Sequence, residues 1–242
     1  MLEIYITGIK PCSGVTFITG GIAATMQGLG YSTAVYSPAQ TGARLKNGYI
    51  QAPDMVFAKY MDSNITTYCS YLYQSKRLNT KVFYAEKLFM DKNVIFQDYM
   101  NIVNKHECVL VTGQSDFSTL IETNFNEEEM VRTMNSPIVL VASLRNSTPE
   151  EILDYLALMK KKDLNLRGII INECPVRSLE YDVRDIQKMI ETTTNIPVLG
   201  IIPKIQDLKS LRPEDWIEYI ICRTDIEAIF NVRISRLSPA SR

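Results

Sequence analysis

The sequence predicts an α/β fold in which a mostly parallel sheet carries helices on both faces. Short apolar runs recur along the chain, and near-continuous runs of this length are typical of strands buried on both faces. Helix-length amphipathic stretches separate these runs, and an alternation of strand and helix favours parallel pairing. The 242 residues, 46% of them hydrophobic and 22% charged, suffice for one large core.

The elements follow from these patterns in chain order. The expected strands are Leu2–Thr7, Thr33–Ser37, Cys108–Thr112, Pro137–Ser143, Gly168–Asn172 and Pro197–Ile202. The expected helices are Thr16–Leu29, Asn93–Lys105, Glu127–Met134, Pro149–Lys161 and Leu179–Thr192. The start at Pro149 is the best marked, because Thr148 can cap it and acids fill its first turn. We expect Leu2–Thr7 to lie inside the sheet.

Residues 43–93 break this rhythm and are rich in Tyr, Asn and Ser. Two interpretations stay open for this region. It is either an excursion over the carboxyl ends of the strands, where such sheets bind ligands, or a set of helices that pack aromatic faces on the sheet. The second is favoured because aromatic side chains are so often buried. We expect a single domain over residues 1–236 and a frayed tail at 237–242.

Charge and composition exclude several classes of function. Lys and Arg total 26 against 27 Asp and Glu, a net charge of -1, so no positive field favours nucleic acid or an anionic membrane. No apolar run approaches the roughly 20 residues of a membrane helix, and Glu3 interrupts the stretch where a signal peptide would be apolar. We therefore expect a cytoplasmic protein. The five cysteines form no C-x-x-C pair, which favours neither a disulfide framework nor a zinc site.

The loop after the first strand has the layout of a phosphate-binding loop. Such loops need backbone N–H groups around the phosphate, a lysine for the terminal phosphates and a hydroxyl for Mg²⁺. Gly8, Gly14 and Thr16 fit this layout, whereas Val15 stands where the lysine belongs. By spacing alone this signal is weak, and a strand-to-helix turn with no ligand remains open.

The chain as a whole resembles the dethiobiotin synthetase family and its relatives, the cobyrinic acid synthases and the amino-terminal domains of some phosphotransacetylases. Thr7–Thr16 looks like that family's first loop, and Tyr36–Gly42 looks like its Tyr-Lys-Pro-Val-Gln-Thr-Gly segment. Val109–Gly113 is similar to a strand that normally reads Val-Glu-Gly-Ala-Gly-Gly. Gly168–Asn172 and Ile196–Pro203 are similar to the two late strands.

This resemblance implies a P-loop NTPase-like fold shared with the Min-type ATPases. For the synthetase it implies closure of a ureido ring from a diamine and bicarbonate, driven by ATP and Mg²⁺, in a homodimer. The positions it assigns to nucleotide are Gly8, Ser13, Gly14 and Thr16 in the loop, with Asn172 and Pro203 at adenine. It places Ser37 and Thr41 on the substrate side, and it gives Thr16 to the metal.

Three charged positions of the family are replaced in this chain. The loop lysine is Val15, the second-strand lysine is Ser37, and the acid after the third strand of the family is Thr112. Charged side chains that hold a transferring phosphoryl group typically stabilise the transition state by several kcal/mol. We therefore expect weak binding of ATP and Mg²⁺ and poor catalysis.

Other residues are candidates to replace the lost charges. Lys10 has the spacing of the first lysine in the Min-type loop, which reaches a phosphate across a dimer, and it is our candidate catalytic residue. It is otherwise a solvated loop charge. Asp54, Asp62 and Asp116 are candidate metal carboxylates, with Asp54 taken as the ligand beside Thr16; loop or capping roles remain the alternative for each.

Three hypotheses of function follow. The first is a degenerate relative that binds a nucleotide, another small molecule or an anion weakly and works by regulating a protein partner. The second is an active ATP-dependent ligase of the cyclo-ligase type that uses Lys10 on an unknown substrate. The third is a structural subunit without a small ligand. A homodimer is expected in each case from the resemblance, with no nucleic acid or membrane partner.

Overall fold

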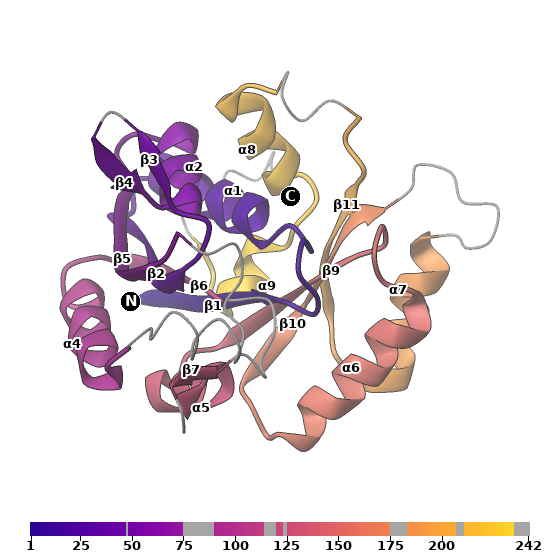
Figure 1. The fold of residues 1–242 in the computed structure, drawn as a ribbon. Helices are drawn as coiled ribbons and strands as arrows, with labels where there is room; N and C mark the ends of the chain where they lie inside the picture. The colour runs from indigo at the N-terminus through magenta and orange to yellow at the C-terminus, as the bar shows by residue number, and fades with distance from the viewer. Residues whose placement is uncertain are drawn as a thin grey trace.

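A seven-stranded sheet forms the centre of the molecule. The computed structural model describes residues 1–46, 48–74, 90–113, 120–122, 125–174, 183–206 and 211–234. The strand order is β11-β10-β9-β1-β6-β2-β5, and every neighbouring pair is parallel (Figure 1). The strands are β1 (Leu2–Gly8), β2 (Thr33–Gln40), β5 (Thr66–Leu72), β6 (Cys108–Thr112), β9 (Ile138–Ser143), β10 (Leu166–Cys174) and β11 (Val198–Pro203). The predicted parallel α/β fold is confirmed.

Helices cover both faces of this sheet (Figure 1). One face carries α1 (Val15–Gly28), α2 (Pro53–Met61), α8 (Pro213–Ile221) and α9 (Ile226–Phe230). The other carries α4 (Lys92–Val103), α5 (Glu127–Met134), α6 (Pro149–Lys161) and α7 (Val183–Thr194). Two small antiparallel hairpins complete the described chain: β3 (Arg44–Lys46) with β4 (Tyr49–Gln51), and β7 (Leu120–Glu122) with β8 (Phe125–Asn126).

The first strand lies inside the sheet, as its apolar sequence predicts. It pairs in parallel with β6 on one side and β9 on the other. Ile4 and Ile6 belong to the core cluster under α1, whereas Tyr5 belongs to the cluster on the opposite face, which is the alternation that a strand imposes. Because neighbouring strands run in the same direction, the loops after β1, β6, β9 and β10 meet at one edge of the sheet.

The tyrosine-rich region adds both a strand and a helix. β5 extends the sheet beside β2, and α2 packs against α1. Tyr68 and Tyr71 therefore lie half-buried on a strand rather than on a helix, and Tyr60 of α2 is 57% exposed. Tyr84 and the tail at 237–242 lie outside the described residues. Nowhere in the described chain is a helix long and apolar enough to cross a membrane.

Candidate functional site

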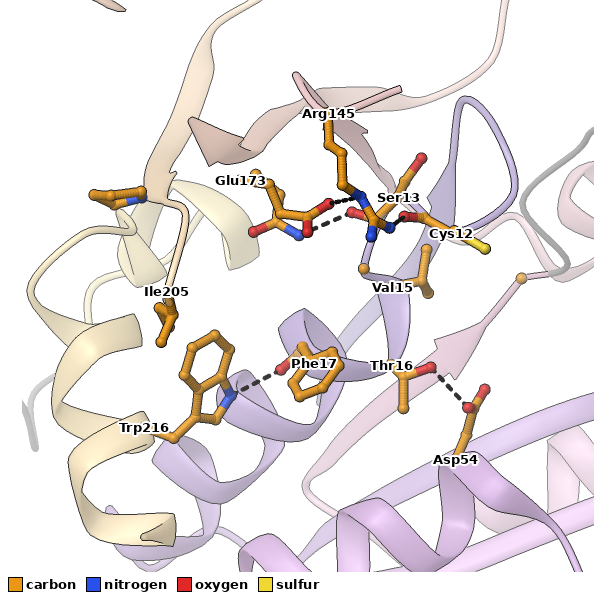
Figure 2. A pocket seen from close by; sticks show the side chains of 14 residues that line it. Cys12, Ser13, Val15, Thr16, Phe17, Asp54, Arg145, Glu173, Ile205 and Trp216 are labelled. Carbon is orange, nitrogen blue, oxygen red and sulfur yellow. Dashed lines mark hydrogen bonds and ion pairs between the residues drawn. The ribbon is translucent and has the colours of Figure 1, made fainter. Parts of the chain in front are cut away.

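A cavity of about 350 Å³ lies at the edge of the sheet where these loops meet. One wall is the loop between β1 and α1, and the opposite wall comes from β11 and α8 (Figure 2). The lining residues are Cys12, Ser13, Gly14, Val15, Thr16, Phe17, Asp54, Gly113, Arg145, Asn172, Glu173, Pro203, Ile205 and Trp216. Five of the predicted nucleotide-side residues are thus brought together: Ser13, Gly14, Thr16, Asn172 and Pro203.

The turn into α1 depends on Gly14. Its φ of 97° lies in the left-handed region, which side chains rarely adopt. The space is also taken, because a Cβ at this position would lie 2.1 Å from the side-chain nitrogen of Asn172. Gly14 is the N-cap of α1 and provides no side-chain cap, while the N–H groups of Phe17 and Ile18 donate to its carbonyl. The helix begins with its first N–H groups uncapped.

The first two loop carbonyls are held by hydrogen bonds from polar side chains. The hydroxyl of buried Ser13 donates to the carbonyl of Lys10 over 2.6 Å. The amide of Asn146, in the loop after β9, donates to the carbonyl of Pro11 over 2.9 Å. Both contacts fix the direction of a peptide plane within the loop.

The next two carbonyls are held in the same way. A guanidinium nitrogen of Arg145 donates to the carbonyl of Cys12 over 3.4 Å, and the amide of Asn172 donates to the carbonyl of Ser13 over 2.9 Å. Asn172 lies at the end of β10 and is buried, so its side chain joins this strand to the loop. Asn172, which the resemblance places at the nucleotide, therefore also supports the loop.

Several peptide N–H groups of this loop have no acceptor in the described chain. The carbonyls of residues 10, 11, 12 and 13 all accept hydrogen bonds. In a trans peptide the N–H points opposite to the carbonyl, so the N–H groups of Cys12, Ser13 and Gly14 point away from these donors, whereas residue 11 is a proline without an N–H. Within the described chain, the N–H groups of Ser13, Gly14, Val15 and Thr16 donate to no protein acceptor. Convergent N–H groups at a helix start form an anion site.

Thr16 and Asp54 form a pair beside this loop (Figure 2). The Thr16 hydroxyl donates to a carboxylate oxygen of Asp54 over 2.7 Å. The backbone N–H of Asp54 donates to the side-chain oxygen of Gln40 over 3.2 Å. Burial raises the pKa of the Asp54 carboxyl above its ordinary value, an effect that hydrogen bonds from Thr16 and Gln40 oppose. A hydroxyl and a carboxylate are hard oxygen ligands of the kind Mg²⁺ takes.

The other candidate carboxylates are placed differently. Asp62 follows α2, and its side chain accepts a hydrogen bond from the backbone N–H of Asn64 over 2.8 Å, which is a turn contact. Asp116 lies outside the described residues. The described chain holds no group of three or more His, Cys, Asp or Glu that could bind a metal without help.

The replaced positions are uncharged and largely buried. Val15 lines the cavity but is 7% exposed and belongs to the core under α1. Ser37 is buried in β2, and its hydroxyl donates to the carbonyl of Ala39 over 3.0 Å. Thr112 is buried at the end of β6. The predicted substrate-side residues Ser37 and Thr41 are not among the residues that line this cavity.

Lys10 also points away from the cavity. Its ammonium forms an ion pair with Glu151 of α6 over 2.7 Å and donates to the carbonyl of Asn146 over 3.3 Å. The ion pair and the backbone N–H of Thr148 hold the pKa of the Glu151 carboxyl below its ordinary value. Both side chains are substantially exposed, at 38% for Lys10 and 49% for Glu151. Gly8 ends β1 directly below the loop.

Several functional candidates escape the sequence pattern. Arg145 and Glu173 line the cavity and form an ion pair over 3.1 Å between their side chains. Phe17, Ile205 and Trp216 form an apolar wall opposite this pair, and the Trp216 N–H donates to the carbonyl of Phe17 over 3.1 Å (Figure 2). These residues come from separate strands, loops and helices, and no local motif marks them.

A buried carboxylate lies behind Gly113, at the end of β6. Glu127, the first residue of α5, is fully buried and accepts hydrogen bonds from the hydroxyls of Tyr5 and Thr7, each over 2.9 Å. Burial, followed by the charge of Glu127, raises the pKa of Tyr5. A Cβ at Gly113 would lie 2.2 Å from a carboxylate oxygen of Glu127, so this oxygen fills the space of a side chain at 113.

Comparisons with known proteins agree with this fold. A family model described as an AAA domain matches residues 3–212. The ATP-dependent dethiobiotin synthetase BioD of Anoxybacillus flavithermus is 27% identical over 208 residues, covering 84% of this chain and 92% of the relative. The ATP-dependent dethiobiotin synthetase BioD of Bacillus velezensis is 25% identical over 240 residues, covering 96% and 98%.

Two solved structures with a similar fold contain MinD. One is the MinC:MinD cell division protein complex of Aquifex aeolicus, with a TM-score of 0.55, 16% identity and coverage of 95% of this chain and 94% of that one. Another is MinD of Pyrococcus horikoshii complexed with Mg-ADP, with a TM-score of 0.51, 14% identity and coverage of 95% and 93%. At these identities the likeness concerns the fold alone. The family model matches most of the chain, and the sequence relatives are dethiobiotin synthetases, so this protein is a dethiobiotin synthetase-like member of the AAA-domain family of P-loop proteins.

Proposed function

We propose that this protein binds a nucleotide weakly through a degenerate P-loop and acts by regulating a protein partner rather than by catalysis. The observation that carries the proposal is the loop itself. Its carbonyls are held by Ser13, Asn146, Arg145 and Asn172, which leaves the N–H groups available to phosphate oxygens.

The charges around the cavity support weak binding. Among the described lining residues, Arg145 carries the one positive side chain, against the carboxylates of Asp54 and Glu173. A triphosphate therefore meets more negative than positive charge unless a cation accompanies it. Thr16 and Asp54 would hold Mg²⁺ at this place, and the ion would supply charge neutralisation to the phosphates. We accordingly propose that ATP binds as its magnesium complex.

The missing lysines argue against efficient phosphoryl transfer. Charged clamps on a transferring phosphoryl group contribute several kcal/mol, and each 1.4 kcal/mol is about a factor of ten in rate. Val15 and Ser37 offer no charge, and both are buried among apolar or backbone contacts. We therefore propose that a diamine, bicarbonate and ATP give no ureido product with this protein.

The decisive experiment is calorimetric titration with ATP in the presence and absence of Mg²⁺, followed by assays for phosphate release and ureido product. We expect weak, Mg²⁺-dependent binding without either product. Asn172→Ala should weaken binding, because it releases the Ser13 carbonyl, while Asn101→Ala on the exposed side of α4 is the matched control. Absence of ATP binding under all conditions refutes the nucleotide proposal, and product formation refutes the degenerate one.

A second candidate is an active ATP- and Mg²⁺-dependent ligase. The intact Thr16–Asp54 pair is compatible with it, because Mg²⁺ held there would serve phosphoryl transfer as well as binding of the nucleotide. In this version Lys10 is the phosphate contact. In a face-to-face homodimer the Lys10 ammonium would leave Glu151 and bind a phosphate of the nucleotide held by the partner subunit. Sedimentation of the protein with and without Mg-ATP tests for the homodimer. The cytoplasmic address stays a prediction.

A further inference from the structure

An arginine and a glutamate face each other at the rim of the cavity, outside the set of residues that the P-loop pattern assigns. Arg145 follows β9, and Glu173 lies near the end of the neighbouring strand β10. The Nε of Arg145 lies 3.1 Å from a carboxylate oxygen of Glu173, and another guanidinium nitrogen reaches the Cys12 carbonyl (Figure 2). The pair therefore sits directly over the anion-binding loop.

We propose that Arg145 supplies the positive charge that this loop lacks at Val15, and that Glu173 competes with the bound anion for it. This inference rests on the proposed function, since it concerns the same anion site. The ligand class is a phosphate or diphosphate group seated on the loop N–H groups. Glu173 then sets how tightly that group binds.

The geometry suits this role for Arg145. A guanidinium carries five N–H donors in a planar fork that matches two phosphate oxygens at once. Its contact with Cys12 keeps the fork beside the loop, and its side chain is 55% exposed, so it is free to turn toward the cavity. Because Arg145 comes from another loop, it approaches from above the N–H groups rather than from the position of residue 15.

Glu173 is built to hold its place as the competitor. The Ser143 hydroxyl donates to the same carboxylate oxygen that pairs with Arg145, over 2.5 Å. The backbone of Glu173 has a φ of 52°, an uncommon conformation for a residue with a side chain. The Glu173 side chain is 20% exposed, so its carboxylate stays at the rim beside Arg145. An anion must therefore displace this carboxylate to gain the full charge of Arg145.

The proposal predicts opposite effects for the two members of one ion pair. Arg145→Gln should weaken binding of the anion about ten- to a hundredfold, because it removes hydrogen bonds between charged groups. Glu173→Gln should tighten binding, because Arg145 loses its competitor and keeps its charge. The double variant should bind like Arg145→Gln alone. A pair that merely supports the loop predicts weaker binding for both single variants.

The experiment is calorimetry of pyrophosphate and of Mg-ATP with the wild type, the two single variants and the double variant. The control variants are Arg132→Gln and Glu128→Gln on α5. Their side chains form an ion pair with an N–O distance of 2.9 Å, and neither residue lines the cavity, so both affinities should stay unchanged. Arg145→Lys keeps the charge without the fork and should give an intermediate affinity. If Arg145→Gln fails to fold, the affinities of Arg145→Lys and of Glu173→Gln still test the proposal.

The outcomes separate this inference from the proposed function. If the wild type binds Mg-ATP but both single variants bind it equally well, or both weaken it, the inference is wrong and the nucleotide proposal stands. If the wild type binds neither probe while Glu173→Gln binds pyrophosphate, the inference stands and the nucleotide proposal fails. If no variant binds either probe, both are wrong.

Discussion

Replacing Gly14 by alanine tests whether the loop and β10 are coupled through Asn172. The substitution introduces a side chain where φ is 97° and where the new Cβ would lie 2.1 Å from the Asn172 side-chain nitrogen. Gly42 is a matched control, because its φ of 73° is also in the left-handed region but no atom lies within 4 Å of its built Cβ. The two variants share the backbone strain and differ in the collision.

The expected costs follow from these two geometries. A side chain in the left-handed region costs of order 1–3 kcal/mol, and Gly42→Ala should lose only this amount of unfolding free energy. Gly14→Ala should lose a further 1–3 kcal/mol, roughly, because Asn172 must move and leave the buried Ser13 carbonyl without its donor. The difference corresponds to about 2–4 °C in Tm for each kcal/mol in a chain of this size.

Urea denaturation of both variants, in the presence and absence of Asn172→Ala, measures this coupling. In the Asn172→Ala background the extra cost of Gly14→Ala should vanish, since both changes remove the same hydrogen bond. Mg-ATP binding should fall for Gly14→Ala and stay unchanged for Gly42→Ala. The coupling argument is refuted if Gly14→Ala and Gly42→Ala cost the same, or if the extra cost persists without Asn172.

Three further predictions concern the charges of the site. Val15→Lys should tighten Mg-ATP binding measured by calorimetry, because it restores a cation to the loop; an unchanged affinity means that the loop is not shaped for phosphate. Burial raises the pKa of Asp54 in the folded protein. The folded state therefore loses stability as the pH rises above the pKa of this carboxyl in the unfolded chain, about 4. Asp54→Asn should remove this loss in urea titrations between about pH 3 and 6 and abolish the Mg²⁺ dependence of ATP binding; a stability difference independent of pH contradicts the assignment. Lys10→Ala should change the unfolding free energy by less than about 0.5 kcal/mol, since its ion pair with Glu151 is exposed, and should abolish any ATP hydrolysis. Hydrolysis that survives this change leaves Lys10 as a solvated charge.

The parts of the fold that the sequence predicts well are those with strong local chemistry. The helices starting at Glu127 and Pro149 begin and end where expected, and both carry a capping box in the structure. The central position of β1 follows from its near-continuous apolar run, which is typical of a strand covered on both faces. By contrast, β5 is half-buried along its length at the sheet edge, and its mixed sequence does not show the pattern of a buried strand.

The candidate site divides in the same way. The loop glycine, Thr16 and Asn172 are predicted from spacing and resemblance, and the structure brings them to one cavity. Arg145 and Glu173 meet only because parallel β9 and β10 end side by side, a relation that no local pattern of residues reveals. The separation of Ser37 from the cavity likewise follows from its inward position on β2, where its hydroxyl binds the backbone.

The apolar wall opposite the loop also gives the protein an optical reporter. Trp216 is the chain's one tryptophan, it is 4% exposed, and it lines the cavity. Its indole N–H is bound to the Phe17 carbonyl in the first turn of α1, so a shift of that turn changes the surroundings of the fluorophore. Intrinsic fluorescence excited at the indole band therefore originates from the wall of this cavity, and we expect its emission wavelength to shift when a ligand fills the cavity.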